Sequence, residues 1–187
     1  SLLWIGEGGG AKRLSGLNHR EIARLFNRTF EVEYGVVMTG GYSEPLYLPD
    51  KQSGKGKSQV RYTYDYASSA LHEASHWCMA GRARRKLVDY GYFYDPPPRS
   101  EVTQRRFEYF ELDAQALECL LSRSADIPFH VSLDDVGTTL ETAYLFRCRV
   151  ERRARDWLMS GLPPRAALFM NRLACNKSVR FAEMSIG

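Results

Sequence analysis

The segment from residue 101 to 123 constrains the fold more than any other part of the chain. Its apolar residues recur at i, i+3 and i+7 spacing, and the stripe consists of Phe107, Phe110, Ala114, Leu117 and Leu121. This spacing brings the side chains onto one face of an α-helix, so a helix is predicted from about residue 101 to 124. Such a stripe faces the hydrophobic core of a globular protein.

The remaining segments predict a mixture of strands and helices. Asn18 and Glu21 have the spacing of an N-cap and its N3 partner, which predicts a first helix over residues 16–30. Segments rich in β-branched and aromatic residues predict strands at 31–40, 44–49 and 59–66, and a short extended piece at 127–133. Further helices are expected at 66–80, 138–159 and 164–175, and the polar segment 50–58 is expected to be a loop.

These elements predict an α+β fold in which a small sheet is packed with about five helices. A chain of 187 residues suits a single domain with one hydrophobic core. We place that domain at residues 17–176, between a flexible N-terminal lead-in (1–16) and a C-terminal tail (177–187).

Charge and composition indicate which partners and which location to expect. The net charge is +4, and basic clusters at 81–86 and 147–155 suit an acidic protein or nucleic acid. The sequence lacks RNP- and KH-type signals, so nucleic acid is not the expected partner. No apolar run approaches the roughly 20 residues of a membrane span, so no membrane partner is expected. The four cysteines are widely spaced without a Cys-x-x-Cys pair, which predicts reduced thiols and a cytoplasmic location.

The stretch "SSALHEASHWCMAG" (68–81) contains the pattern His-Glu-x-x-His at His72, Glu73 and His76. On a helix, residues i and i+4 lie on the same face, so the two imidazoles can share one metal ion. The pattern is typical of zinc peptidases, in which the glutamate is the general base. A third histidine shortly after the second would mark the extended peptidase type, and residues 77–86 contain none.

A third ligand is therefore expected from elsewhere in the chain. The helix predicted at 101–124 carries a second stripe next to its apolar one, formed by Glu108, Glu111, Gln115 and Glu118. We expect Glu111 to be the third ligand, with Glu108 as the alternative. His19 is expected to face solvent, and His130 in the short extended segment is a weaker candidate.

Two histidines and one carboxylate leave open positions on a metal. With Fe(II) this is the facial triad of non-haem oxygenases, and with zinc it is a hydrolase site. Glu73 would be the general base in the hydrolase, and would support the ligands or pair with a cationic substrate in the oxygenase. Spacing alone does not choose between these two classes.

The sequence resembles the elongation factor P hydroxylase family. The resemblance is carried by residues 44–49, 66–94, 107–118, 128–132 and 161–169, and most specifically by "HEASHWCMAGRARRK" (72–86). It implies an iron-dependent enzyme that hydroxylates a lysine of elongation factor P after a β-lysyl group has been attached. It also implies a fold like that of a metal-bound ribonuclease (the YbeY type), with Fe(II) on His72, His76 and Glu111 (or Glu108) and O2 as co-substrate.

The implied substrate is a long cationic side chain, which aromatic rings and carboxylates bind well. Tyr66 and Tyr92 are the expected aromatic contacts, among the tyrosines that flank the histidine segment, and Arg82 and Arg85 are expected to help dock the protein substrate. A zinc-dependent hydrolase, either a peptidase or a ribonuclease, is the alternative. A non-enzymatic RNA-binding domain is the third possibility.

Overall fold

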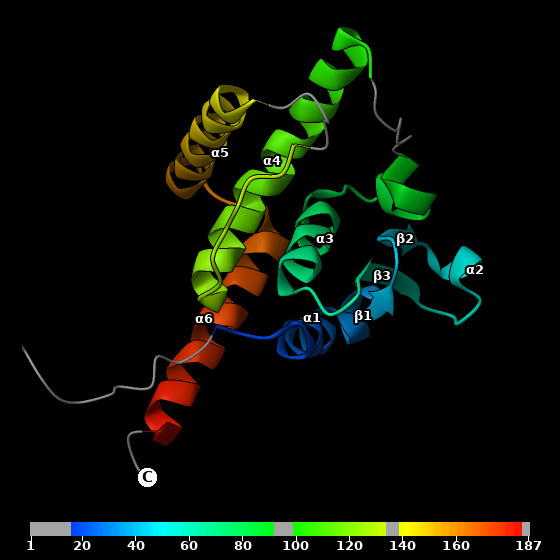
Figure 1. Cartoon of the computed structure of the whole chain (residues 1–187). Helices are drawn as coiled ribbons and strands as arrows, with labels where there is room; N and C mark the ends of the chain where they lie inside the picture. The colour runs from blue at the N-terminus through cyan, green and yellow to red at the C-terminus, as the bar shows by residue number, and fades with distance from the viewer. Residues whose placement is uncertain (1–15, 92–98, 134–138, 185–187) are drawn as a thin grey trace, which may run out of the picture.

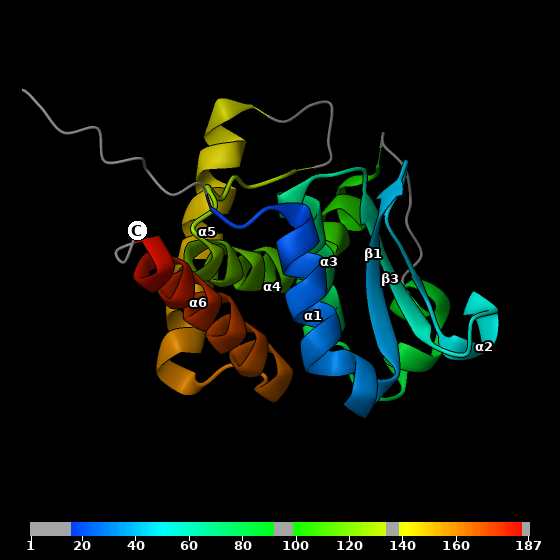
Figure 2. The ribbon, with the colours of Figure 1, turned by 90° about the horizontal axis from the view of Figure 1, so that it is seen from below.

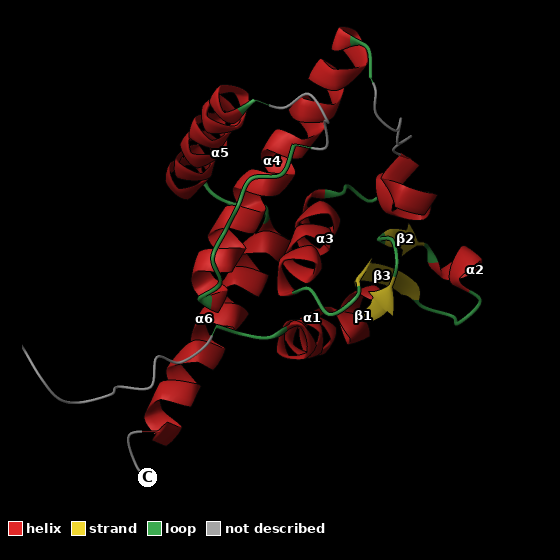
Figure 3. Ribbon diagram, in the orientation of Figure 1, coloured by secondary structure: helices red, strands yellow, loops and turns green. Residues whose placement is uncertain are grey.

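A computed structural model describes residues 16–91, 99–133 and 139–184 of the chain (Figure 1). Three strands form one mixed sheet in the order β1-β3-β2, with β1 at Val36–Tyr42, β2 at Leu46–Leu48 and β3 at Ser58–Thr63. Strand β3 is parallel to β1 and antiparallel to β2. The predicted α+β fold is confirmed: the chain is a single domain with a small sheet and helices around it (Figure 3).

The helices follow the predicted order. They are α1 (His19–Tyr34), α2 (Asp50–Ser53), α3 (Ala67–Met79), α4 (Glu101–Ala125), α5 (Leu140–Ser160) and α6 (Pro164–Met184), with short 3-10 turns at Arg84–Lys86 and Val88–Gly91. Helices α1 and α3 lie on one face of the sheet, and α4, α5 and α6 lie beyond them (Figure 2). Within the described ranges, no helix is both long and apolar enough to cross a lipid bilayer.

An aromatic cluster joins α1, α3 and α6 in the core. The Trp77 ring lies 5.2 Å from Phe26 and 4.7 Å from Phe30, measured between ring centroids, and Phe169 lies 5.5 Å from Phe26. Phe26, Phe30 and Phe169 are completely buried, and Trp77 is 1% exposed. Burying aromatic rings of this size contributes strongly to stability, so α3 is firmly fixed between the sheet and the outer helices.

Helix α4 buries more of its surface than the apolar stripe alone predicts. Ala114, Leu117 and Leu121 are fully buried, as expected, and Phe110 is half-buried. The neighbouring polar stripe is also buried: Glu111, Gln115 and Glu118 are 8%, 2% and 7% exposed. Acidic side chains are rarely buried in this way without partners. This polar face is turned towards α3.

Three segments differ from the predictions. Residues 31–34 belong to α1 and not to a strand, because the helix continues until Gly35 ends it with a left-handed backbone (φ 60°). Residues 50–53 form α2 instead of a loop, and α6 continues beyond residue 175 to Met184. The predicted capping box of Asn18 and Glu21 is present.

Helix α3 ends without the glycine cap that Gly81 could have supplied, since the helix stops at Met79 and Ala80 is extended. The last carbonyl groups of α3 accept hydrogen bonds from two arginines. Arg165 of α6 donates to the carbonyls of Cys78 and Ala80, and Arg85 donates to Ala80. A cation is favourable at the carboxyl end of a helix, where the carbonyl dipoles accumulate negative potential.

On the side of β1 that does not pair with β3, the Asn27 side chain of α1 binds the backbone. The Asn27 amide donates to the carbonyl of Met38 at 3.2 Å and accepts from its N–H at 2.6 Å. These two bonds satisfy backbone groups that an edge strand otherwise presents to other chains.

The first prediction concerns this edge. Asn27→Ala removes both hydrogen bonds, so the free energy of unfolding should fall by about 2 kcal/mol, at roughly 1 kcal/mol per bond. Urea denaturation followed by circular dichroism measures the change, with Arg28→Ala as the control because Arg28 is exposed on the same helix. Equal losses for the two variants would contradict the role given to Asn27.

Candidate metal centre

Helices α3 and α4 run in opposite directions and meet through polar side chains. His72 lies opposite Glu118, and Glu111 lies near both His72 and His76. The Nε2 atom of His72 is 3.5 Å from Glu111 Oε2, and that of His76 is 3.4 Å from Glu111 Oε1. The two Nε2 atoms are 3.1 Å apart.

The imidazoles and the carboxylate thus converge on one point. One ligand atom from each of His72, His76 and Glu111 lies within 4.8 Å of the other two, which suits a single metal ion. About a quarter of each histidine side chain is exposed (26% and 24%), whereas that of Glu111 is 10% exposed. The group is therefore enclosed on the α4 side and accessible from the histidine side.

Glu118 fixes the orientation of the His72 imidazole. Its Oε2 atom lies 2.9 Å from His72 Nδ1. An ionised carboxylate only accepts hydrogen bonds, so Nδ1 carries the proton and Nε2 is the atom left to bind an ion. A carboxylate behind a metal-binding histidine is the usual second partner of such ligands. Two nitrogens and one oxygen suit iron(II), zinc and related divalent ions.

Gln115 orients the carboxylate ligand. Its Nε2 atom donates to Glu111 Oε2 at 3.4 Å and to the Ser132 carbonyl at 2.7 Å, while its Oε1 accepts from Ser132 N–H at 3.0 Å. The paired bonds to Ser132 fix which way the amide points. They also attach the segment after α4 to the site.

The charged groups of the site are paired with one another. Burial disfavours charge on His72, but the hydrogen bond with Glu118 and the nearby Glu111 carboxylate raise the pKa of His72 to about 10. Burial likewise disfavours the ionised form of Glu111, but His76 and His72 lower the pKa of that carboxyl to about 2. Each charge is thus stabilised by a partner of opposite sign.

Glu73 lies beside the histidines but outside the ligand group. It is 9% exposed. Burial raises the pKa of its carboxyl, against the opposing influence of His72 and His76. A carboxyl in such surroundings can hold a proton or balance a cation.

Among the described residues, Tyr90 has its ring beside that of His76. Its ring stacks on that of Tyr47 at 4.3 Å and on that of His76 at 6.4 Å, centroid to centroid. Tyr90 is 7% exposed, and its buried hydroxyl has no hydrogen-bond partner among the described residues. Asp89 and Tyr90 both adopt positive φ (45° and 59°), a strained backbone that functional sites often contain.

The other expected site residues are spread over different places. The Glu108 carboxylate accepts a hydrogen bond from Arg149 at 3.1 Å, so it pairs with α5 and not with the histidines. His19 is half-buried, not free in solvent, and its Nδ1 lies 2.9 Å from the Tyr62 hydroxyl. His130 is exposed and lies outside the ligand group.

The expected substrate contacts differ in how accessible they are. Tyr66 is 53% exposed and Arg82 is exposed. The Arg85 guanidinium, in contrast, lies 5.7 Å from the ring centroids of Tyr34 and Trp77, so it serves in packing α3. Tyr92 lies outside the described residues.

Spacing alone gave no role to the α4 residues that support the ligands. Glu118 and Gln115 stand in the same polar stripe as Glu111, seven and four residues further along, so they lie on the same face of the helix. Tyr90 is one of the tyrosines that flank the histidine segment, and a strained turn brings it to His76.

Comparison with known proteins adds independent information. The sequence profile of the family described as elongation factor P hydroxylase matches residues 25–182. The elongation factor P lysine hydroxylase of Haemophilus influenzae is 38% identical over 146 residues, which cover 78% of this chain and 82% of the relative. The profile match includes α3 and α4 with the ligand group.

The second prediction tests the orienting carboxylate. Glu118→Gln should weaken binding of a divalent ion about tenfold or more, because the neutral amide no longer holds His72 as a carboxylate does. Titration calorimetry with Co²⁺ measures the affinity, and Glu108→Gln on the same helix is the matched control. Unchanged affinity in Glu118→Gln would show that Glu118 does not support the site.

The third prediction concerns protons. At pH 7 the metal-free His72 is protonated, because its pKa is raised to about 10, whereas Glu111, with its pKa lowered to about 2, is already ionised. An ion needs the Nε2 lone pair, so binding should release about one proton from His72, and affinity should rise with pH up to about 10. Calorimetry in buffers of different ionisation enthalpy counts the protons, and an identical heat in all buffers would contradict this.

Proposed function

The chain belongs to the elongation factor P hydroxylase family, and from this premise we propose that it hydroxylates the β-lysyl-modified lysine of elongation factor P. We propose Fe(II) as the cofactor, held by His72, His76 and Glu111, with O2 as co-substrate. The observation that carries the proposal is the convergence of two imidazoles and one carboxylate between α3 and α4. A cytoplasmic location, where translation factors act, is part of the same proposal.

The chemistry explains why a metal is needed. Hydroxylation of an unactivated C–H bond is beyond ordinary side chains, and iron with O2 supplies the oxidising power when bound. The residues of the chain hold the ligands in place. Glu118 keeps the His72 proton on Nδ1, and Gln115 holds the Glu111 carboxylate through Ser132.

The surroundings suit a cationic substrate. Glu73 and Asp89 add carboxyl groups close to the histidines, and Tyr90 adds an aromatic ring stacked on His76. Rings and carboxylates attract an ammonium group, more strongly where water is excluded. We assign Glu73 to this environment: it would balance the charge of the lysine side chain and receive or return a proton. Tyr66, Tyr92, Arg82 and Arg85 stay predicted substrate contacts.

A zinc-dependent hydrolase is the second candidate. It is favoured by Glu73, which is buried beside both histidines and has a raised pKa, as expected of a general base. In that case Glu73 would take the proton from a water molecule during hydrolysis of a peptide or RNA bond. The family membership favours the hydroxylase.

The fourth prediction separates the two candidates. Protein prepared without oxygen should contain iron, and after addition of O2 and a reductant it should add about 16 mass units to β-lysyl-modified elongation factor P. His72→Ala should lose the mass gain, and Glu73→Gln should retain part of it. Mass spectrometry of the intact factor measures the gain.

The opposite pattern would overturn the proposal. Zinc at full occupancy, hydrolysis that does not need O2, and complete loss of that activity in Glu73→Gln would identify the hydrolase. A full mass gain with His72→Ala would show that the ligand assignment is wrong. Glu108→Gln serves as the control that should keep full activity.

A further inference from the structure

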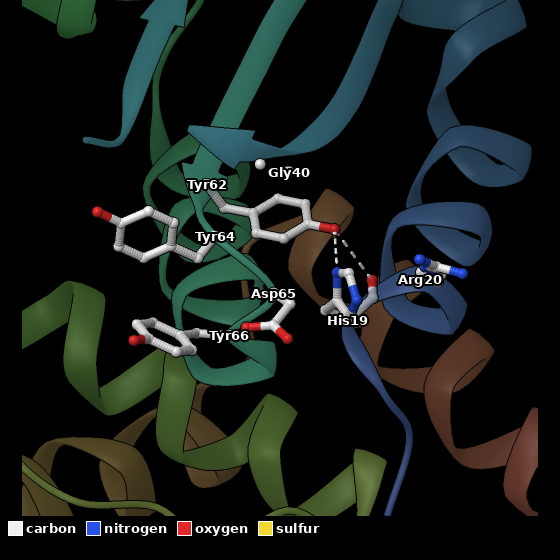
Figure 4. A pocket seen from close by; sticks show the side chains of 8 residues that line it. His19, Arg20, Gly40, Tyr62, Tyr64, Asp65 and Tyr66 are labelled. Carbon is white, nitrogen blue, oxygen red and sulfur yellow. Dashed lines mark hydrogen bonds between the residues drawn. The ribbon is translucent and has the colours of Figure 1, made fainter. Parts of the chain in front are cut away.

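A hollow lies next to the amino-terminal end of α3. It is a pocket of about 840 Å³, and its lining includes none of the residues of the ligand group. One wall consists of Tyr64, Asp65 and Tyr66, in the turn between β3 and α3, and the other consists of His19, Arg20 and Tyr62 (Figure 4). The pocket thus joins the start of α1 to the start of α3.

The wall formed by Tyr62 is held rigidly. The Tyr62 side chain is only 2% exposed, and its hydroxyl lies 2.9 Å from His19 Nδ1. Its ring crosses the backbone of Gly40 so closely that a Cβ there would lie 2.4 Å from ring atoms. Glycine is therefore required at position 40 for the ring to take this place.

The opposite wall depends on a strained residue. Tyr64 has a positive φ of 43°, which is uncommon for a bulky side chain. Two backbone hydrogen bonds to β1, from Tyr64 N–H to the Tyr42 carbonyl and from Gly41 N–H to the Tyr64 carbonyl, hold it there, each at 2.8 Å. Strain that the surrounding structure maintains is a frequent mark of a functional site.

The same turn brings two rings and a carboxylate together at the surface. The rings of Tyr64 and Tyr66 meet edge to face at 5.7 Å, centroid to centroid. They are 51% and 53% exposed, and Asp65 between them is also exposed. The two tyrosine rings lie outside the core and beside a carboxylate. Aromatic rings combined with a carboxylate bind organic cations.

We propose that this pocket is a binding site for an alkylammonium group of the substrate, with Tyr64, Tyr66 and Asp65 as its contacts. The inference rests on the proposed function, because a factor carrying a β-lysyl-modified lysine presents such groups. Two sources share this chemistry: the lysyl extension itself, and a lysine next to it in the substrate chain. Arg20 on the facing wall can donate to a backbone carbonyl of the substrate.

The position of the pocket fits a substrate that reaches both sites. Tyr66 is the N-cap residue of α3, and His72 follows six residues later. At about 1.5 Å per residue along a helix, the two lie roughly 9 Å apart along the axis of α3. Three residues of an extended chain cover this axial component, and a somewhat longer segment that also follows the surface of α3 around its axis can reach both sites.

Binding itself is tested with a small probe. Nα-acetyl-lysine methylamide should shift the backbone amide signals of residues 64–66 in ¹H–¹⁵N NMR spectra, and the Nε-acetylated analogue, which lacks the charge, should not. Asp65→Asn and Tyr66→Leu should lose the shifts, whereas Tyr66→Phe, which keeps the ring, should retain them. Asp156→Asn and Tyr144→Leu, at exposed positions of α5, are the matched controls.

Turnover of the natural substrate provides the second measurement. In Asp65→Asn the KM for the modified factor should rise at least fivefold while kcat and the bound metal stay unchanged. A rise with the modified factor alone would assign the pocket to the lysyl extension, and weaker binding of the unmodified factor as well would assign it to a neighbouring lysine. Unaltered KM together with no probe shifts in the wild type would overturn the inference.

The two proposals fail in different ways. If the proposed hydroxylation is wrong but the pocket binds cations, the probe still shifts residues 64–66 and no mass gain is seen. If the pocket assignment is wrong, the mass gain persists in Asp65→Asn with the KM of the wild type.

Discussion

The burial of charged groups between α3 and α4 is the constraint on which the rest of the structure depends. Two histidines and the carboxyl groups of Glu111 and Glu118 meet at a helix interface, where isolated charges are costly. The interface is possible because each group has a partner of opposite sign or a hydrogen bond. Buried charge pairs of this kind add little to the stability of a fold. Their presence here is better explained by a requirement to bind an ion.

Packing elsewhere holds this interface in place. Trp77 follows His76 directly and is enclosed by aromatic rings of α1, while Arg165 of α6 caps the end of α3. One face of α3 therefore packs into the hydrophobic core, and another face carries the two histidines. Ligands built on a helix that is fixed in this way keep their positions better than ligands on a loop.

Much of the fold and of the site could be predicted from the sequence, because both depend on helical periodicity. His72, His76 and Glu111 lie on regular helices, so spacing placed them on suitable faces. Spacing did not distinguish Glu111 from Glu108, which lie one turn apart on the same stripe. That choice depends on how far α4 slides along α3, and on Arg149 of α5, which pairs with Glu108. The end of α1 was misplaced because Tyr34 packs on Trp77, a contact distant in sequence.

The ligand group also joins two distant points of the chain. His76 and Glu111 belong to helices separated by the connection from residue 80 to 100, and the described cysteines are all free. An ion shared by these side chains would act as a cross-link, closing a loop of the chain as a disulfide does in a secreted protein. Closing a long loop restricts the unfolded chain. Loss of the ion would then loosen the connection between α3 and α4 as well as empty the site.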